Sequence, residues 1–291
     1  MSSMRLEDER LDVLPVRGSL SLVLPAYNEA ANLEAVVRRA LAVLPEFVEE
    51  LEIVVVNDGS RDETGAIAER LSREDSRVRV IHHPVNRGYG AALRSGFAAT
   101  RGELVMFMDA DQQFDPADFL HLAPFLPHAD IVAGYRIRRR DPWIRLVYAA
   151  IFNAAMRLLF GITVRDIDCA FKVIRGDLVR SLDLRMDGAL VNTELLAKAQ
   201  RAGATIVEVG VRHYPRLSGE PSGGNVRVIL RAMREVLQLW WLLLRYQPPR
   251  GLGRGRPQPR TSQLLRTGAL AFLGLSATWW LVRRLRQRGR R

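Results

Sequence analysis

The chain has 291 residues, a formal net charge of +11 and one cysteine. This length suits one large domain with appendages, or two modest domains. An apolar share of 48% with a charged share of 26% excludes a wholly disordered protein. The single thiol, Cys169, excludes an internal disulfide and a thiolate metal cluster.

The positive charge is confined to the C-terminal end. Residues 250–291 contain 11 arginines and no acidic residue, so the first 249 residues hold 32 basic and 32 acidic groups. A basic tail on a neutral body predicts an anionic partner surface. The neutral body lacks the basic face of a nucleic-acid-binding domain, so we expect a membrane surface and no nucleic acid. The polar start has no signal-peptide core, and we expect the body to stay in the cytoplasm.

Strand-like and helix-like segments alternate in the first half of the chain. Expected strands cover 20–24, 52–56, 78–81 and 104–108, and expected helices cover 30–44, 60–71 and 91–100. Ser60 and Glu63 form a capping-box pattern at the start of the second helix. Buried strands that alternate with helices predict an α/β fold with a mostly parallel sheet flanked by helices.

The second half is less regular. Expected strands cover 131–135 and 204–211, expected helices cover 143–160, 190–202 and 225–246, and a flexible loop covers 216–224. Composition divides the whole chain into a polar extension (1–17), an α/β domain (18–224), an amphipathic helix (225–246), a Pro/Gly/Arg linker (247–263), and a hydrophobic segment with a basic tail (264–291).

Polar clusters follow the predicted strands. Asp109 and Asp111 end a buried strand, and burying two such carboxylates unpaired costs several kcal/mol each. A divalent cation shared with a diphosphate would relieve the repulsion, and a solvated turn is the alternative. Ligands of parallel sheets bind beyond the carboxyl ends of the strands, where Tyr27 and Asp58 also fall.

Four other polar residues are not assigned to the site. His82, His83 and His213 make no metal-binding pattern with the acidic residues, so we expect structural or surface roles for them. Glu194, inside a predicted helix, is a candidate for contact with the acceptor, but we favour a structural role in the helix. The Asn86–Gly90 stretch contains a G-x-G that follows the third strand, so we interpret it as a loop beside a nucleotide.

The motifs, taken in order, resemble those of the family 2 glycosyltransferases with the GT-A fold. The resembling segments are Pro25-Ala-Tyr-Asn-Glu29, Val54-Val-Val-Asn-Asp-Gly-Ser60, Asn86-Arg-Gly-Tyr-Gly90 and Asp109-Ala-Asp-Gln-Gln113. Within the family the chain is most similar to dolichyl- or polyprenyl-phosphate mannosyl- or glucosyltransferases. This similarity rests on Gln113, Gly134-Tyr-Arg136, Asp166-Ile-Asp-Cys-Ala-Phe-Lys172 and Arg216-Leu-Ser-Gly-Glu220. The chain departs from the pattern at Asn57, where aspartate is commoner, and at Gly223, where the family has lysine.

The resemblance implies a metal-dependent, inverting hexosyltransferase that moves a hexose from a nucleotide sugar to polyprenyl phosphate. It implies a nucleoside pocket of Pro25, Tyr27, Glu29, Val56 and Asp58, nucleotide contacts from Asp109 and Ala110, Mg²⁺ or Mn²⁺ on Asp111 and Gln113, and phosphate contacts from Arg136, Arg145 and Arg216. Asp111, Arg136 and Arg216 would be catalytic. The donor is GDP-mannose or UDP-glucose, with the overall pattern slightly favouring GDP-mannose.

A lipid acceptor requires the enzyme to reach a bilayer. The predicted helix 225–246 carries Arg227, Arg231 and Arg234 on one face and Trp240 and Trp241 near its end, which is typical of an interfacial helix. An amphipathic helix packed on the domain is the alternative interpretation, and the two can coexist along its length. The apolar segment 267–282 would span about 24 Å as a helix, short of a bilayer core of about 30 Å. We expect a protein at the cytoplasmic face of the cell membrane, peripheral or anchored C-terminally. For the segment 267–282 we favour a monotopic or hairpin-like anchor, with a tilted span or a helix packed within a homo-oligomer as the alternatives.

Two other classes compete with a transferase. A Rossmann-type oxidoreductase is disfavoured because the first strand leads into Pro-Ala-Tyr-Asn-Glu and not into a glycine fingerprint. A non-catalytic basic membrane adaptor would account for the tail, but it leaves the acidic motifs unexplained.

Overall fold

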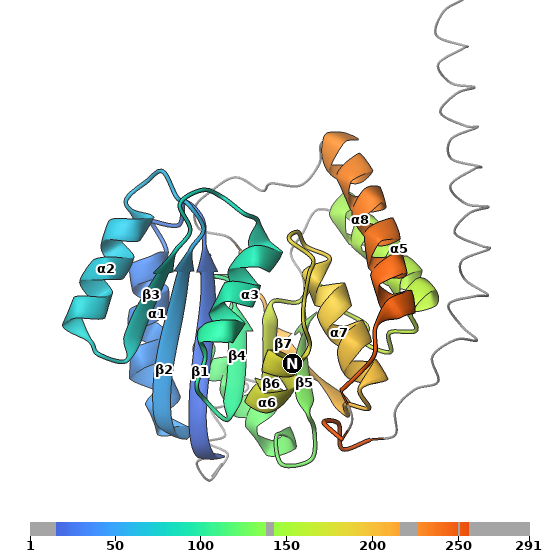
Figure 1. The fold of residues 1–291 in the computed structure, drawn as a ribbon. Coiled ribbons are helices and arrows are strands. Elements are labelled where there is room, and N and C mark those ends of the chain that lie inside the picture. Colours follow the sequence, from blue (N-terminus) through green and yellow to red (C-terminus); the bar gives the residue numbers. More distant parts are fainter. Residues whose placement is uncertain (1–15, 138–142, 216–225, 250, 256–291) are drawn as a thin grey trace, which may run out of the picture.

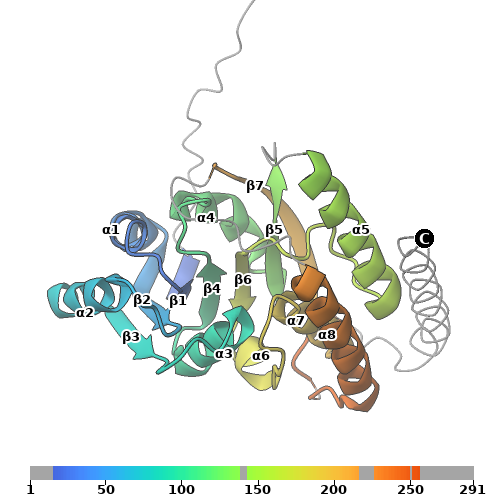
Figure 2. The ribbon, with the colours of Figure 1, turned by 90° about the horizontal axis from the view of Figure 1, so that it is seen from above.

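The computed structural model describes residues 16–137, 143–215, 226–249 and 251–255. These residues form a seven-stranded sheet in the order β3-β2-β1-β4-β6-β5-β7, with helices on both faces (Figure 1, Figure 2). The strands are β1 (Val16–Ala26), β2 (Val48–Asn57), β3 (Val78–His82), β4 (Leu104–Met108), β5 (Ile131–Ile137), β6 (Phe171–Arg175) and β7 (Ile206–Arg212). The α-helices are α1 (Leu33–Val43), α2 (Thr64–Glu74), α3 (Tyr89–Ala99), α4 (Phe119–Leu122), α5 (Trp143–Phe160), α6 (Gly176–Ser181), α7 (Val191–Arg201) and α8 (Val226–Arg245). Short 3₁₀ turns are η1 (Leu44–Glu46), η2 (Pro116–Asp118) and η3 (Ala123–Phe125).

The sheet is mostly parallel, as the alternating pattern predicts. β3, β2, β1 and β4 run parallel to one another, and β5 runs parallel to β7. β6 pairs antiparallel with both β4 and β5. The β6 segment was missed in the sequence because Lys172 interrupts its apolar run. The structure buries Lys172 completely, and its ammonium donates to the carbonyl oxygen of Ile167 at 3.0 Å. A cation satisfied by backbone carbonyls is tolerated inside a sheet layer.

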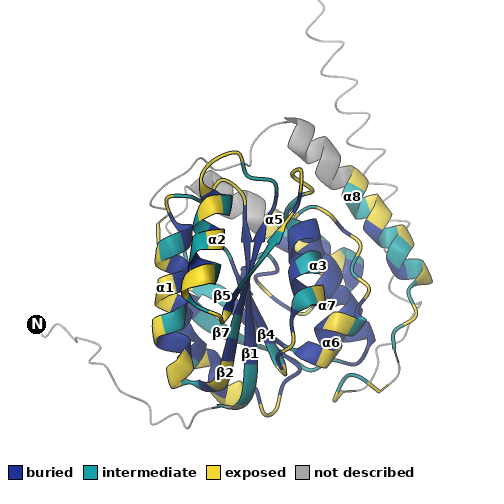
Figure 3. Ribbon diagram, turned by 60° about the vertical axis from the view of Figure 1, so that its left-hand side comes forward, coloured by how far each residue is buried: buried dark blue, intermediate teal, exposed yellow. Residues whose placement is uncertain are grey.

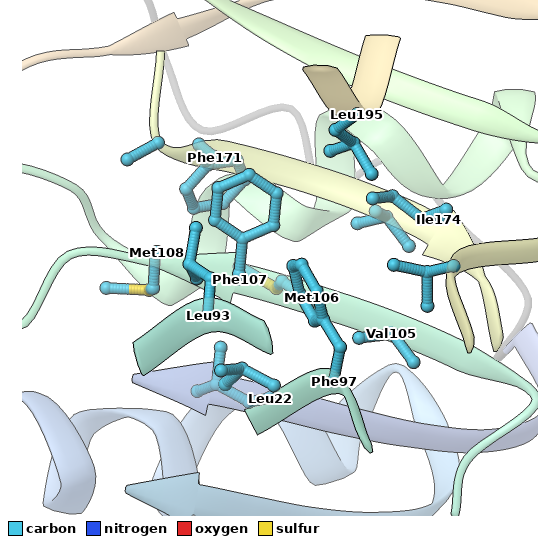
Figure 4. Packing of buried hydrophobic residues seen from close by; sticks show 14 of the residues in the cluster. Leu22, Leu93, Phe97, Val105, Met106, Phe107, Met108, Phe171, Ile174 and Leu195 are labelled. Carbon is cyan, nitrogen blue, oxygen red and sulfur yellow. The ribbon is translucent and has the colours of Figure 1, made fainter. Parts of the chain in front are cut away.

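Helices cover the two faces of the sheet separately. α1 and α2 lie on one side, and α3, α6 and α7 lie on the other (Figure 3). The core between β4 and α3 is aromatic, with the rings of Phe97 and Phe107 5.6 Å apart at an interplanar angle of 70° (Figure 4). Because both faces are covered, β4 is buried continuously from Val105 to Met108.

The start of α2 differs from its sequence prediction. α2 begins at Thr64, and the predicted capping box of Ser60 and Glu63 does not form. The Ser60 hydroxyl instead accepts the Asn28 N–H at 3.0 Å, and the Asp62 carboxylate accepts the Thr64 N–H at 3.0 Å. The Ser60 hydroxyl, which the sequence pattern predicts to cap α2, therefore bonds the loop after β1 instead.

The end of the described chain packs back onto the domain. α8 buries Leu239 and Leu243, so one face of this helix belongs to the core. Beyond it, the Arg254 N–H donates to the Asp130 carboxylate at 2.9 Å, and the Gly255 N–H donates to the Gly203 carbonyl at 2.8 Å. The first part of the predicted linker is thus attached to the domain, and residues 256–291 lie outside the described part of the chain.

The close packing of α3 on the sheet predicts that Gly96 cannot be replaced by a larger residue without loss of stability. A Cβ atom there would lie 2.3 Å from Val23 Cγ1 and 3.2 Å from Val56 Cγ2. We expect Gly96→Ala to lower the free energy of unfolding by about 1–3 kcal/mol, because β-branched neighbours cannot rotate away from the added methyl group. Ala98→Leu on the exposed side of the same helix is the control, and urea unfolding of both variants is the measurement. Equal stability of Gly96→Ala and the wild type would contradict this packing.

Candidate active site

The topology creates a crevice at the carboxyl ends of β1 and β4. The chain passes from β1 to β2 and β3 on one side, then returns to β4 on the other side of β1. Parallel strands that diverge in this way leave a ligand crevice beyond their carboxyl ends. Pairing of β1 with β4 stops at Val23 and Phe107, and the predicted site residues Pro25, Asp109 and Asp111 follow.

The acidic segment after β4 is shaped as a turn. Asp111 is 2% exposed, and its Oδ1 accepts the Gln113 N–H at 3.1 Å. Gln112, between them, has a φ of +62° and donates its amide to Asn32 Oδ1 at 2.9 Å. Asp109 is half-buried at the strand end, and Ala110 is buried. The predicted metal residues are therefore held on a tight turn and not on an open loop.

Gln113 is bound at both its backbone and its side chain. Its carbonyl accepts the Tyr214 N–H at 2.9 Å, and its side-chain Nε2 donates to the Tyr214 carbonyl at 3.2 Å. The amide nitrogen is thus engaged, so a metal ion at Gln113 would have to bind the amide oxygen. This contact could not be predicted from local sequence patterns, because residues 113 and 214 are far apart in the chain.

An oxygen-ligated divalent cation fits this arrangement. Carboxylate and amide oxygens are the ligands that Mg²⁺ and Mn²⁺ prefer, and Mg²⁺ is commonly held by one or two protein carboxylates together with substrate phosphates. Within the described ranges no three His, Cys, Asp or Glu side chains gather into a metal cage. Asp111 and Gln113 would therefore hold the ion together with a bound diphosphate.

The end of β1 supplies the exposed part of the crevice. Tyr27 is 42% exposed, so its ring is accessible to a ligand, and Pro25 is buried beside it. The Glu29 N–H donates to the Thr64 hydroxyl at 2.8 Å, and the Glu29 carboxylate accepts the Asn32 side-chain amide at 2.7 Å. Glu29 thus also fixes the start of α1.

Asp58, at the end of β2, holds a neighbouring loop. Its carboxylate accepts His83 Nδ1 at 2.6 Å, the Arg87 N–H at 2.9 Å and the Gly88 N–H at 2.8 Å. The prediction that His83 is structural is confirmed, since its other nitrogen bonds the Ser95 hydroxyl at 2.9 Å.

Val56, the partner of Asp58 in the predicted pocket, is fully buried. Its side chain faces Gly96 of α3 across the core. Only the backbone at Val56 can therefore contact a nucleoside.

Arg136 forms an ion pair that the sequence did not indicate. Its Nε and Nη2 donate to the two oxygens of Asp166 at 2.8 and 2.7 Å, and its backbone N–H donates to the same carboxylate. Burial opposes ionisation of Asp166, but the hydrogen bonds and charge of Arg136 prevail and lower the pKa of this carboxyl. The Nε and Nη2 edge of the Arg136 guanidinium is therefore already bonded to Asp166.

Glu194 has the structural role expected for it. It is fully buried, accepts the Met186 N–H at 2.8 Å and pairs with Lys198 at 2.7 Å. These contacts fix the loop before α7. Of the remaining predicted residues, Arg145 lies in the first turn of α5 but its side chain is not described, and Arg216 lies outside the described residues.

The comparisons with known proteins identify the family. Residues 21–182 match the model for Glycosyl transferase family 2. The chain belongs to this family. The fold is GT-A, and it matches glucosyl-3-phosphoglycerate synthase of Mycobacterium tuberculosis, solved with Mn²⁺, UDP and phosphoglyceric acid, with a TM-score of 0.59, 27% identity and 80% coverage of each chain.

Three relatives of this family 2 chain carry the names of glycosyltransferases or of enzymes of polyprenyl-phosphate sugars. Polyprenol monophosphomannose synthase of Mycolicibacterium smegmatis is 33% identical over 83% of this chain and 94% of its own length. Glycosyltransferase AglD of Haloferax volcanii is 34% identical over 77% of this chain, which spans 37% of that relative. An undecaprenyl-phosphate 4-deoxy-4-formamido-L-arabinose transferase of Pseudomonas fluorescens is 30% identical over 72% of this chain and 61% of its own length.

The turn at Asp111 predicts a variant that loses the metal and keeps the fold. Asp111→Asn removes one charge at a strand end without changing core volume, so we expect transfer to be abolished and thermal unfolding to change little. Mn²⁺ binding, measured in the presence of GDP or UDP, should weaken in parallel. Asp115→Asn is the matched control, because that carboxylate pairs with Arg39 on the surface at 3.1 Å. A folded Asp111→Asn protein with full activity would refute the metal assignment.

Proposed function

We propose that this chain transfers a hexose from a nucleoside diphosphate sugar to polyprenyl phosphate with inversion. The observation that carries the proposal is the Asp111–Gln113 turn at the β1/β4 crevice, which offers oxygen ligands where a diphosphate would bind. The near-full-length match to a polyprenol monophosphomannose synthase supports the lipid acceptor.

In the proposed complex the nucleoside lies at the ends of β1 and β2. Tyr27 would stack on the base, Pro25 and the Val56 backbone would line the pocket, and Glu29 and Asp58 would bound it. Because Asp58 is bonded by His83 and two backbone N–H groups, we assign it to holding the pocket wall as well as to contact with the ribose.

The diphosphate would lie beside the acidic turn. Asp109 and Ala110 would contact the nucleotide, and Mg²⁺ or Mn²⁺ on Asp111 and Gln113 would neutralise charge on the leaving diphosphate. Arg136, Arg145 and Arg216 would bind donor or acceptor phosphates, because a guanidinium donates to two phosphate oxygens at once. The Asp166 pair pre-orients Arg136 for this contact.

The acceptor would not need a strong general base. The second pKa of a phosphate monoester is about 6, so its oxygen is already ionised near neutral pH. That oxygen would form a bond to the anomeric carbon from the side opposite the departing diphosphate. The expected product is a β-linked polyprenyl phosphate sugar.

Membrane contact would come from α5, α8 and the basic tail. On α5, Ile151 and Leu158 are 61% and 64% exposed, and on α8, Leu237 and Trp241 are 40% and 56% exposed. Apolar side chains of this kind favour insertion at a lipid surface. None of the described helices combines the length and the apolar character needed to cross a membrane.

A panel of acceptors and donors tests the function. Purified enzyme with Mn²⁺ or Mg²⁺ is given labelled GDP-mannose or UDP-glucose with polyprenyl phosphate, and the lipid product is counted. We expect labelled lipid from one of the two donors, and its loss when the metal is chelated. 3-Phosphoglycerate serves as a second acceptor, because the matched structure contains phosphoglyceric acid. Transfer to 3-phosphoglycerate without transfer to lipid would contradict the proposal.

The attachment of residues 251–255 defines a truncation that spares the domain. Removing residues 256–291 deletes nine arginines and leaves the contacts of Arg254 and Gly255 in place. We expect unchanged nucleotide affinity and weaker binding to anionic vesicles, since each basic residue near such a surface contributes about 1 kcal/mol. Transfer to lipid-embedded acceptor should fall more than transfer to a short, water-soluble polyprenyl phosphate. Equal losses on both acceptors would show that the tail supports the active site and is not an anchor.

A further inference from the structure

The helix α3 is capped at its start by a loop from a distant part of the chain. Its N-cap residue, Gly88, has a φ of +100° and no side chain that could accept an N–H of the first turn. The Gly90 N–H instead donates to the Asp187 carbonyl oxygen, in the loop before α7, at 2.7 Å. The first turn of a helix needs such an acceptor, and an N-cap side chain usually provides it. The loop before α7 therefore takes the place of a capping side chain.

The two segments approach each other closely. A Cβ atom at Gly88 would lie 2.5 Å from the Asp187 carbonyl oxygen, and a Cβ atom at Gly90 would lie 2.2 Å from the Met186 carbonyl oxygen. Both distances are shorter than any non-bonded contact of a side-chain carbon. The loop can therefore reach the start of α3 only because these two positions have no side chain.

Arg94 fixes this loop from the next turn of α3. Residues four apart lie on the same face of a helix, so the Arg94 side chain reaches the loop that accepts the Gly90 N–H. Its Nη1 donates to the Met186 carbonyl oxygen at 2.9 Å, and its Nη2 donates to Asp187 Oδ1 at 2.6 Å. From the other side, the Glu194 carboxylate of α7 accepts the Met186 N–H at 2.8 Å. The backbone at Met186 is thus held between α3 and α7.

The start of α3 is also bonded to the proposed nucleoside pocket. The N–H groups of Arg87 and Gly88 donate to the Asp58 carboxylate at 2.9 and 2.8 Å. Asp58 and the Asp187 carbonyl therefore hold the same short segment, 87–90, from two sides. A shift of the loop before α7 would move the N–H groups that fix Asp58.

We propose that Arg94 is a positioning residue for the nucleotide sugar, and that it acts by holding the Met186-Asp187 backbone against the start of α3. Both of its described side-chain bonds go to this loop, so its effect on the pocket passes through the backbone of residues 87–90. The proposal rests on the proposed function, because it requires Asp58 to line the nucleoside pocket.

Arg94→Met in the full-length chain tests this role. The probe is GDP or UDP with Mn²⁺, whichever the wild type binds more tightly, and affinity is measured by titration calorimetry. We expect about a tenfold loss of affinity, because a pocket wall that moves by a fraction of an ångström loses part of its contacts. The donor KM should rise to a similar extent with a smaller change in kcat. A residue that only stabilised the fold would lower the unfolding temperature and leave the affinity unchanged, and that result would overturn the proposal.

Two variants of the same loop separate its position from its charge. Arg185→Met removes an exposed arginine that pairs with Asp183 at 2.8 Å, and the affinity should stay within about twofold of the wild type. Asp187→Ala removes the carboxylate, which is 66% exposed, but keeps the carbonyl that caps α3, so we expect a loss of less than about threefold. A loss in either control as large as that in Arg94→Met would assign the effect to charge and overturn the proposal.

Arg94→Lys shows whether a positive charge alone is sufficient. Lysine lacks the planar fork that reaches two acceptors at once, so we expect an affinity between those of the wild type and Arg94→Met. An affinity within about twofold of the wild type would show that charge suffices and would overturn the proposal. This variant carries the test if Arg94→Met does not fold. Failure of the wild type to bind either nucleotide would instead remove the proposed function, and this assignment with it.

Discussion

The divergence of β1 from β4 beyond Val23 and Phe107 is the constraint on which the site depends. β1 continues beside β2 as far as Ala26, while β4 ends at Met108 beside β6. No strand fills the resulting gap among the described residues, so the ends of both strands face a crevice. Pro25, which has no N–H to donate, is accommodated there because the ladder to β4 has already ended.

The carboxylates near the crevice are divided between support and ligand binding. Asp58 is satisfied by a histidine and two backbone N–H groups, and Asp166 by the guanidinium of Arg136. Burying a carboxylate is tolerable only with such partners. These pairs shape the loops after β2 and before β6. Asp111 lies on a turn, where its Oδ1 accepts the Gln113 N–H at 3.1 Å.

The C-terminal helix α8 has some apolar side chains in the core and others exposed at the surface. α8 buries Leu239 and Leu243 against the domain while it exposes Leu237 and Trp241, so the same helix can belong to the core and face a surface. The two interpretations of its amphipathic pattern are therefore not exclusive. The basic stripe predicted at Arg227 and Arg231 falls where side chains are not described, whereas Arg234 is exposed.

The sequence by itself determined the fold class, the family and the order of the motifs. Apolar runs that end in Tyr27, Asp58 and Asp109 predict parallel strands whose carboxyl ends meet, because strand period and helix period are local properties of the chain. The prediction from local sequence was wrong at Ser60, which does not cap α2 but accepts the N–H of Asn28 in another loop. A local sequence pattern does not show which backbone group from a distant segment will bond a given side chain in the folded protein.

Only the tertiary structure decided which polar residues work together. The ion pair of Arg136 with Asp166, the hydrogen bonds between Gln113 and Tyr214, and the contact of Asp58 with His83 all join residues from different segments of the chain. Each contact exists because the sheet order brings β4, β6 and the N-termini of α3 and α7 to one place. The sequence motifs identified the polar groups that can donate and accept hydrogen bonds. The strength of their interactions depends on burial in a low-dielectric interior and on short distances, and both arise only on folding.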